Sequence, residues 1–524
     1  MPEGISETSE PAATSLPESS PSTVPLPAVA EPPGAETVPV QPGIVGMAGK
    51  LAGLLLDDFY EESYNQLLLR DPQRLTGMQL SKAFGLRNDQ LTNISDAYLR
   101  ETQELEVAIL HLLRSYDRAA LTAGQQISYD VYEWHLDSLV RGHEFMYHNH
   151  PLHHFLGSYQ FNLDQLFTEY HLLVDRQDVE DYISRLSQVD DQVEQLMEGL
   201  ALREEAGLVP PRFIVELTSD DLMAYLQIVS PDPVAIDAEL LPVYTVLREG
   251  VQKLDDLSAS EKQAFLDAAL TEIEESFIPA HLKLLDYLDQ LANIAADQAG
   301  LCRFPSGDDY YAYLLRRETS TDLTPAEIHE IGLAEVARIQ GEIRQAFAEL
   351  GYPQDESLGE LMERAVYDGG LINISSQNGK DEYVGAVEAL IARADQRTEA
   401  AFDLRPTREV VVIGGATGGY YVPGASDGSR PGAYHVNLLG TWRPRYSMPT
   451  IAYHEAIPGH HLQIAIAQDL ELPRFRNEVV LNAYAEGWAL YAERLAWELG
   501  LYDDDPYGNI GRLQLELLRA VRLV

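Results

Sequence analysis

Residues 453–463 read Tyr-His-Glu-Ala-Ile-Pro-Gly-His-His-Leu-Gln, and the rest of the chain is interpreted outward from this stretch. His454 and Glu455 match the start of a His-Glu-x-x-His helix, in which two imidazoles one turn apart bind zinc and the glutamate activates a water. The spacing differs here, because Pro458 occupies the place of the second histidine. The next candidates are His460 and His461.

A straight helix cannot bring these histidines together. A residue six positions after His454 lies about 120° around the helix, and one seven positions later lies about 10 Å along the axis. Neither separation is compatible with Zn–N bonds of about 2.0–2.1 Å. Proline removes a backbone donor and glycine permits unusual dihedral angles, so the sequence predicts a break or bulge at Pro458-Gly459.

A second candidate stretch runs from Asn482 to Glu493 and reads Asn-Ala-Tyr-Ala-Glu-Gly-Trp-Ala-Leu-Tyr-Ala-Glu. Glu486 follows His460 after 25 intervening residues, and a carboxylate on a following helix is a usual third zinc ligand. Small neighbours would let this helix approach closely. The alternative is that Glu486 and Glu493 form a solvated face, as most helical glutamates do. The Ala, Gly, Trp and Tyr surroundings favour burial, and a buried glutamate needs a partner such as a metal.

These stretches resemble a known family. Together, His454–Gln463 and Ala485-Glu486-Gly487-Trp488 are similar to the bacterial "domain of unknown function 885" family. The resemblance runs from about residue 48 to the last residue and includes three further segments, 207–211, 319–332 and 420–434. That family is similar to gluzincin metallopeptidases. The resemblance therefore implies a mainly α, large helical zincin-like fold with a deep cleft and a small β-sheet preceding the zinc helix.

The resemblance also implies a zinc metallopeptidase mechanism. Zn²⁺ would be held by His454, His460 and Glu486, with His461 as the alternative ligand to His460. We favour His460 because Gly459-His460 aligns with the Gly-His of related motifs. Glu455 would act as general base and then as general acid in the hydrolysis of a peptide.

Residues for substrate binding are expected near two strands, at 409–413 and 433–438. An edge strand of a small sheet can pair with a peptide by β-augmentation. Tyr420, Tyr421, Tyr434 and His435 are then candidates to line the cleft, although simple strand packing explains each of them equally well. Arg519 and Arg522 either bind a substrate carboxylate or lie on a helix surface.

Composition excludes several other classes. The net charge of −46 argues against binding to nucleic acid or to anionic membranes. The single cysteine, Cys302, excludes an intramolecular disulfide framework and a cysteine-based zinc site. No apolar run reaches the 18–20 residues of a transmembrane helix. The sequence does not predict an oligomeric state.

The chain is expected to contain one domain after a flexible leader. Residues 1–45 are rich in Pro, Ser and Glu and contain no Lys or Arg, which is typical of disorder. Such a segment often follows a secretion signal or lipid anchor, so an exported or cell-envelope location is favoured over the cytoplasm. Residues 46–524 are predicted to form a single helical metallopeptidase-like domain.

The helices are predicted from amphipathic runs that begin at Ile44 and continue at 92–116, 127–143, 178–206, 234–255, 259–299, 308–315, 319–350 and 384–403. Leu518–Val524 resembles the beginning of a longer family segment, so the domain is expected to be truncated at its C-terminus, and the loss of a histidine from that segment puts activity in doubt. Two alternatives to a peptidase remain. One is a zinc hydrolase of ester or non-peptide amide bonds, and the other is an inactive peptide-binding protein.

Overall fold

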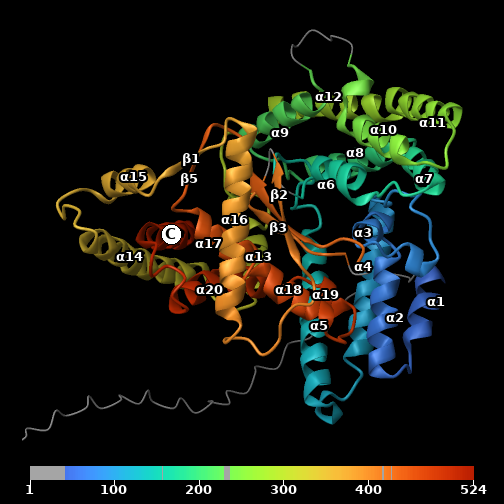
Figure 1. The fold of residues 1–524 in the computed structure, drawn as a ribbon. Coiled ribbons are helices and arrows are strands. Elements are labelled where there is room, and N and C mark those ends of the chain that lie inside the picture. Colours follow the sequence, from blue (N-terminus) through green and yellow to red (C-terminus); the bar gives the residue numbers. More distant parts are fainter. Residues whose placement is uncertain (1–41, 156, 229–235, 416–417, 426–427) are drawn as a thin grey trace, which may run out of the picture. The chain divides into compact units, whose positions relative to one another are not determined.

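Amphipathic helices joined by short turns make up most of the chain (Figure 1). The computed structural model describes residues 42–155, 157–228, 236–415, 418–425 and 428–524. The predicted mainly α class is confirmed. The predicted disordered segment lies outside the described residues except for 42–45, which begin the first helix. None of the described helices is long and apolar enough to span a membrane.

The first group of helices is built on one apolar core. It contains α1 (Pro42–Leu51), α2 (Leu56–Leu68), α3 (Pro72–Gly77), α4 (Asp96–Leu113) and α5 (Ala123–Gly142). The helix expected to run on from Ile44 is two helices, because Gly53 between them takes a positive φ of 80°. Phe475 of α19 (Phe475–Glu478) stacks on Tyr132 in this core, with 4.4 Å between ring centroids. The C-terminal third of the chain therefore packs against the N-terminal helices.

The second group surrounds the largest apolar core of the described residues. It contains α6 (Tyr159–Gln165), a π-helical turn (Leu166–Tyr170), α7 (Arg176–Leu186), α8 (Val189–Glu205), α9 (Arg212–Tyr225), α10 (Pro242–Lys253), α11 (Ala259–Glu272) and α12 (Ile278–Ile294). Capping explains several boundaries. Asp175 and Asp178 form a reciprocal capping box at the start of α7, and Ser258 with Glu261 does the same for α11.

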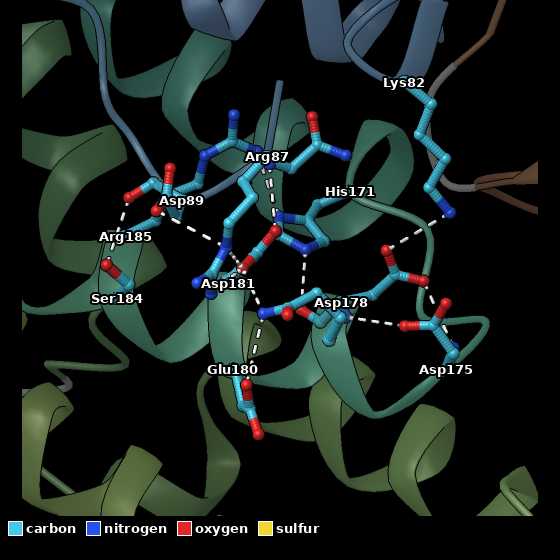
Figure 2. A network of polar contacts seen from close by, with 12 residues as sticks. Lys82, Arg87, Asp89, His171, Asp175, Asp178, Glu180, Asp181, Ser184 and Arg185 are labelled. Carbon is cyan, nitrogen blue, oxygen red and sulfur yellow. Dashed lines mark hydrogen bonds and ion pairs between the residues drawn. The ribbon is translucent and has the colours of Figure 1, made fainter. Parts of the chain in front are cut away.

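A buried polar network joins these two groups of helices (Figure 2). Arg185 of α7 is fully buried, and its guanidinium donates to the Gln90 carbonyl (3.0 Å), to Thr76 Oγ1 (2.6 Å) and to His171 Nδ1 (3.0 Å). Nε2 of His171 in turn donates to the carbonyl of Asp178 at 2.9 Å. Burial, together with the charge of Arg185, lowers the pKa of His171 to about 3, so this ring is a neutral acceptor for the arginine.

Arg185→Met is expected to lower the free energy of unfolding by about 3 kcal/mol or more. The substitution leaves two buried acceptors, Thr76 Oγ1 and His171 Nδ1, without their donor, and each unsatisfied buried group costs about 1–3 kcal/mol. Urea unfolding followed by circular dichroism measures the change. Arg176→Met on the same helix is the control, because Arg176 forms an exposed ion pair with Glu261, and such pairs contribute about 1 kcal/mol or less. Equal losses in the two variants would contradict a structural role for Arg185.

The third part of the chain carries the strands and the residues of interest. Its helices are α13 (Gly307–Thr319), α14 (Pro325–Glu349), α15 (Leu358–Asp368), α16 (Gln377–Thr398), α17 (Met448–Glu455), α18 (His460–Asp469), α19, α20 (Asn482–Glu498) and α21 (Pro506–Leu523). Thr324 caps α14 ahead of Pro325, as predicted. An apolar core joins α16, α17 and the end of α20, and another joins α14, α15 and α21.

Two small sheets precede α17. One pairs β1 (Leu371–Asn373) antiparallel with β5 (Trp442–Pro444). The other has the order β2-β4-β3, in which β2 (Val410–Gly415) runs parallel to β4 (Gly432–Asn437) and β3 (Tyr420–Val422) runs antiparallel to it. The predicted strands at 409–413 and 433–438 correspond to β2 and β4. Because β4 lies in the middle, the edges of this sheet are β2 and β3.

Candidate metal centre

The turn between α17 and α18 brings His454 and His460 together. Helix α17 ends at Glu455 and α18 begins at His460, so the predicted break at Pro458-Gly459 is confirmed. Gly459 is required there, because a Cβ atom on it would lie 1.8 Å from the His454 carbonyl oxygen. The ring centroids of His454 and His460 lie 4.9 Å apart as a result.

Glu486 of α20 completes a group of three. Its Oε2 lies 3.5 Å from His454 Nε2, and its Oε1 lies 3.6 Å from His460 Nε2. One ligand atom from each residue lies within 4.8 Å of the other two. Ligand atoms around a tetrahedral zinc ion are separated by about 3.4 Å when the bonds are about 2.0–2.2 Å long. The described residues therefore contain a His-His-Glu group that could hold a metal ion.

Burial differs among the three residues. His454 and His460 are largely buried, whereas 56% of the Glu486 side chain is exposed. The expectation that Glu486 would be buried is therefore wrong. Glu486 lies near the start of α20, where the helix opens to solvent, while Glu493 lies two turns further along the same face and is buried. Small residues do line the buried face of α20, but Gly487 has open space beside it.

Glu493 orients the ring of His454. Its Oε1 lies 2.9 Å from His454 Nδ1, and its Oε2 accepts a hydrogen bond of 2.6 Å from Thr450. Because a carboxylate only accepts, Nδ1 carries the proton and Nε2 faces Glu486 and His460. Arg519 of α21 also contacts Glu493 Oε1, at 3.0 Å. Thr450, Glu493 and Arg519 thus form a chain of contacts on the Nδ1 side of His454, opposite the side that faces Glu486 and His460.

Sequence reasoning missed this orienting role of Glu493 and Thr450. The available signal was the spacing of Glu486 and Glu493, because residues seven apart lie on the same face of a helix and both can approach one histidine. No sequence pattern marked Thr450, which comes from the helix of His454 itself.

The charges around the group explain its pKa values. Burial alone lowers the pKa of His454, but the interactions with Glu486 and Glu493 outweigh it and raise the pKa to about 9. The pKa of His460 is lowered to about 4 by burial and by the charge of His454. A metal ion competes with the proton at such nitrogens, because only the unprotonated ring is a ligand.

Glu455 is a buried carboxylate without a hydrogen bond among the described residues. It is 6% exposed, and burial raises its pKa to about 7, with the charge of His454 opposing this shift and that of Glu486 adding to it. It comes directly after His454 at the end of α17. A carboxylate that makes no other bond and titrates near neutral pH has the properties of a general base.

Trp488 ties the turn to α20. Its indole Nε1 donates to the carbonyl of Pro458 at 2.9 Å. Glu486 lies two residues earlier on the same helix, so this bond couples the position of the carboxylate to the position of the turn between the histidines.

His461 does not join the group. It is buried, its Nδ1 lies 3.0 Å from the Tyr421 hydroxyl, and its Nε2 donates to the Arg408 carbonyl at 3.1 Å. Because the carbonyl only accepts, Nδ1 is the acceptor for Tyr421. Both ring nitrogens of His461 are thus engaged in holding α18 against the strands.

The predicted substrate-binding residues occupy several different environments. Tyr420 stacks on His435 with 4.8 Å between centroids, and Tyr434 is buried in the core beneath the sheet. Arg519 contacts Glu493, as described above. Arg522 is exposed near the end of α21.

A cavity of about 640 Å³ lies beside the group. Its wall includes Gln463 and Ile464 of α18, Tyr484 and Ala485 of α20, and Val422 of β3. Ala485 directly precedes Glu486, and Gln463 lies one turn after His460, so sequence neighbours of the group form part of this wall. His454, Glu455, His460 and Glu486 themselves do not line the cavity. None of the six predicted substrate-binding residues is part of its wall.

Glu493→Gln is expected to weaken metal binding by about 10- to 100-fold, the usual effect of removing a carboxylate that orients a ligating histidine. Competition with a chromophoric chelator measures the dissociation constant. Glu498→Gln is the matched control, because Glu498 lies on the same helix but is exposed and pairs with Arg494. An unchanged dissociation constant in Glu493→Gln would contradict the orienting role.

Comparisons with known proteins agree with this fold. The structure is similar to that of a "putative lipoprotein" from Colwellia psychrerythraea, with a TM-score of 0.82, 26% identity, and coverage of 91% of this chain and 82% of that one. It also resembles a "putative lipoprotein of unknown function" from Shewanella oneidensis, with a TM-score of 0.57, 16% identity, and coverage of 88% and 80%. The second likeness shows the fold alone. No curated protein sequence matches significantly.

A family model matches residues 77–524, which contain every residue of the His-His-Glu group and Glu455. The resemblance noted from the sequence is thereby confirmed. The chain belongs to the family described as bacterial protein of unknown function, DUF885.

Proposed function

We propose that this protein is a zinc-dependent hydrolase that cleaves peptide bonds. The observation that carries the proposal is that the His454, His460 and Glu486 group lies next to a buried carboxylate, Glu455, whose side chain makes no hydrogen bond among the described residues. A binding protein has no need of such a carboxylate. Burying it without a partner costs stability, and this cost is expected where the group has a catalytic task.

The donor set suits zinc. Two imidazole nitrogens and one carboxylate are a common catalytic zinc set, and each imidazole Nε2 lies 3.5 or 3.6 Å from one oxygen of Glu486, close to the edge of a zinc tetrahedron. The exposure of Glu486 leaves one side of the group open to solvent, as a catalytic site requires. When bound, the ion supplies Lewis acidity, which lowers the pKa of water and polarises a carbonyl.

The remaining chemistry belongs to the side chains. Glu455 takes up a proton at its carboxylate from the attacking water and gives it to the nitrogen of the leaving amine. A pKa near 7 suits both transfers at neutral pH. Glu493 and Thr450 keep His454 in one tautomer, and Trp488 keeps Glu486 in register with the turn.

The cavity beside the group favours a peptide over other acyl substrates. Its volume of about 640 Å³ lies within the range of about 300–1,000 Å³ that is usual for ligand pockets. Val422, in its wall, belongs to β3, which is an edge of its sheet. An extended peptide is able to pair with such an edge, and a simple ester has no use for it.

We also propose that residues 46–524 form a single zincin-like domain that works in the cell envelope. Residues from Gln41 onward cluster as one compact unit, which supports the domain proposal. The name of the Colwellia protein, a "putative lipoprotein", supports an exported or envelope location.

The test is metal content beside hydrolysis of a peptide library. We expect about one zinc per chain by elemental analysis, lost in His460→Ala and in Glu486→Ala. His461→Ala is the matched control, because it removes the neighbouring histidine while leaving His454, His460 and Glu486 in place. It should keep its zinc.

Mass spectrometry of the library after incubation with the zinc-loaded protein detects cleavage. A folded parent that binds no zinc when it is supplied would refute the proposal. Zinc retained in His460→Ala but lost in His461→Ala would move the ligand to His461.

A further inference from the structure

Three arginines line the cavity beside the His-His-Glu group. They are Arg74 of α3, Arg430 just before β4, and Arg476 of α19. Two carboxylates, Asp71 and Glu478, share the wall. This concentration of cations is unusual for a chain with 37 basic and 83 acidic residues.

None of the three arginines forms an ion pair with a carboxylate of the described residues. Arg74 donates to the Tyr64 hydroxyl (2.8 Å) and to the carbonyl of Glu478 (3.2 Å). Arg476 donates to Ser128 Oγ at 3.2 Å. Arg430 is half-buried, its backbone carbonyl accepts from the Ala425 N–H at 2.9 Å, and its guanidinium makes no hydrogen bond or ion pair within the part of the chain that the structure describes.

The carboxylate of Asp71 does not neutralise them. It caps α3 by accepting from the backbone N–H of Arg74 at 3.1 Å, and it accepts a second bond from Thr92 Oγ1 at 2.5 Å. The three arginines therefore line the cavity, and no carboxylate of the described residues forms an ion pair with their guanidinium groups. Planar guanidinium groups bind carboxylates bidentately, and partial burial strengthens the interaction.

We propose that this cavity binds the free carboxylate of the peptide substrate, with Arg430 and Arg476 as the residues that determine specificity. The inference rests on the proposed function, since it names the substrate class of the same site. The inference places the scissile bond at the His-His-Glu group and the carboxylate in the cavity, whose wall includes Ala485, the residue before Glu486, together with the three arginines.

The net charge of the protein is negative, so a preference for anionic peptides would indicate specific contacts in the cavity. At a net charge of −46 the surface repels anions at long range, so a preference for an anionic peptide has to arise from local contacts. The arginines predicted from the sequence for this task, Arg519 and Arg522, lie elsewhere. Arg519 forms an ion pair with Glu493, and Arg522 is exposed.

The test is equilibrium binding in the Glu455→Gln background, which separates binding from cleavage. A library of tripeptides and tetrapeptides is prepared as free acids and as C-terminal amides, with Asp and Glu in one half replaced by Asn and Gln. Ultrafiltration and mass spectrometry identify the retained peptides, and fluorescence anisotropy measures their dissociation constants. We expect free acids to bind about tenfold or more tightly than amides.

Arg430→Gln and Arg476→Gln should each reduce this preference, and Arg430→Lys should restore part of it. Arg494→Gln is the control, because Arg494 lies outside the cavity wall and pairs with Glu498. If tight binding requires Asp or Glu side chains and not a free C-terminus, the carboxylate that the arginines bind belongs to an acidic side chain of the peptide. The same arginine–carboxylate contact then has a different source.

Equal binding of acids and amides, absence of any retained peptide, or a preference that survives both glutamine variants would overturn the inference. The two proposals fail separately. Cleavage without carboxylate preference refutes the inference alone, and carboxylate-dependent binding without zinc or cleavage refutes the proposed function alone.

Discussion

Glu455→Gln is expected to keep its zinc and to hydrolyse peptides about 10²- to 10⁴-fold more slowly than the parent, the usual contribution of a general base. The substitution preserves the size of the side chain and removes its ability to accept a proton. It touches neither His454 nor Glu486, so metal content should stay near one per chain. Elemental analysis and the rate of peptide hydrolysis, measured on the same preparation, check the two halves of this expectation.

The melting temperature of Glu455→Gln provides a second test of this prediction. The Glu455 carboxylate is buried and has no hydrogen-bond partner among the described residues, so replacing it by a neutral amide removes no bond. We expect the melting temperature to stay the same or to rise, because an unpaired buried charge is costly. A purely structural glutamate would behave in the opposite way and lose stability on substitution. An unchanged hydrolysis rate in Glu455→Gln would exclude Glu455 as the base.

Gly459→Ala is expected to abolish metal binding and to lower the free energy of unfolding by about 3 kcal/mol or more. A Cβ atom at residue 459 would lie 1.8 Å from the carbonyl oxygen of His454 and 2.5 Å from that of Tyr453. Both atoms belong to the backbone of α17, so no flexible side chain is available to move aside. The turn has to open, and His460 then separates from His454.

Gly487→Ala provides the control for this substitution. Gly487 lies in α20 beside Glu486, and a Cβ atom there meets nothing within 4 Å. Because alanine is the better helix former, this variant should be as stable as the parent or more stable by up to about 1 kcal/mol. Thermal unfolding with and without added zinc measures both variants. Zinc-dependent stabilisation that persists in Gly459→Ala would show that the turn does not set the distance between the histidines.

Local signals predicted much of the helical framework. Apolar spacing located α4 and α5 within a few residues, and Thr324-Pro325 marked the start of α14. The run predicted at 234–255 contains α10 but begins well before it, and residues 234 and 235 lie outside the described residues. The boundaries failed where a single residue interrupts a continuous pattern. Gly53 divides the run that begins at Ile44, and the run at 259–299 contains a π-helical turn at Ile273–Phe277, where apolar spacing continues without a break.

The sequence by itself determined that α17 must end before His460, because Pro458 and Gly459 act on the dihedral angles of their own backbone and need no distant partner. It also determined the family and the mainly α class. Only the tertiary structure decided that His460 faces His454 while His461 bonds to Tyr421 and Arg408. It likewise decided that Glu493 is buried behind His454 and that Glu486 is open to solvent. These outcomes depend on how α20 and α21 pack against α17, and contacts between residues far apart in the chain leave no local pattern from which to predict them.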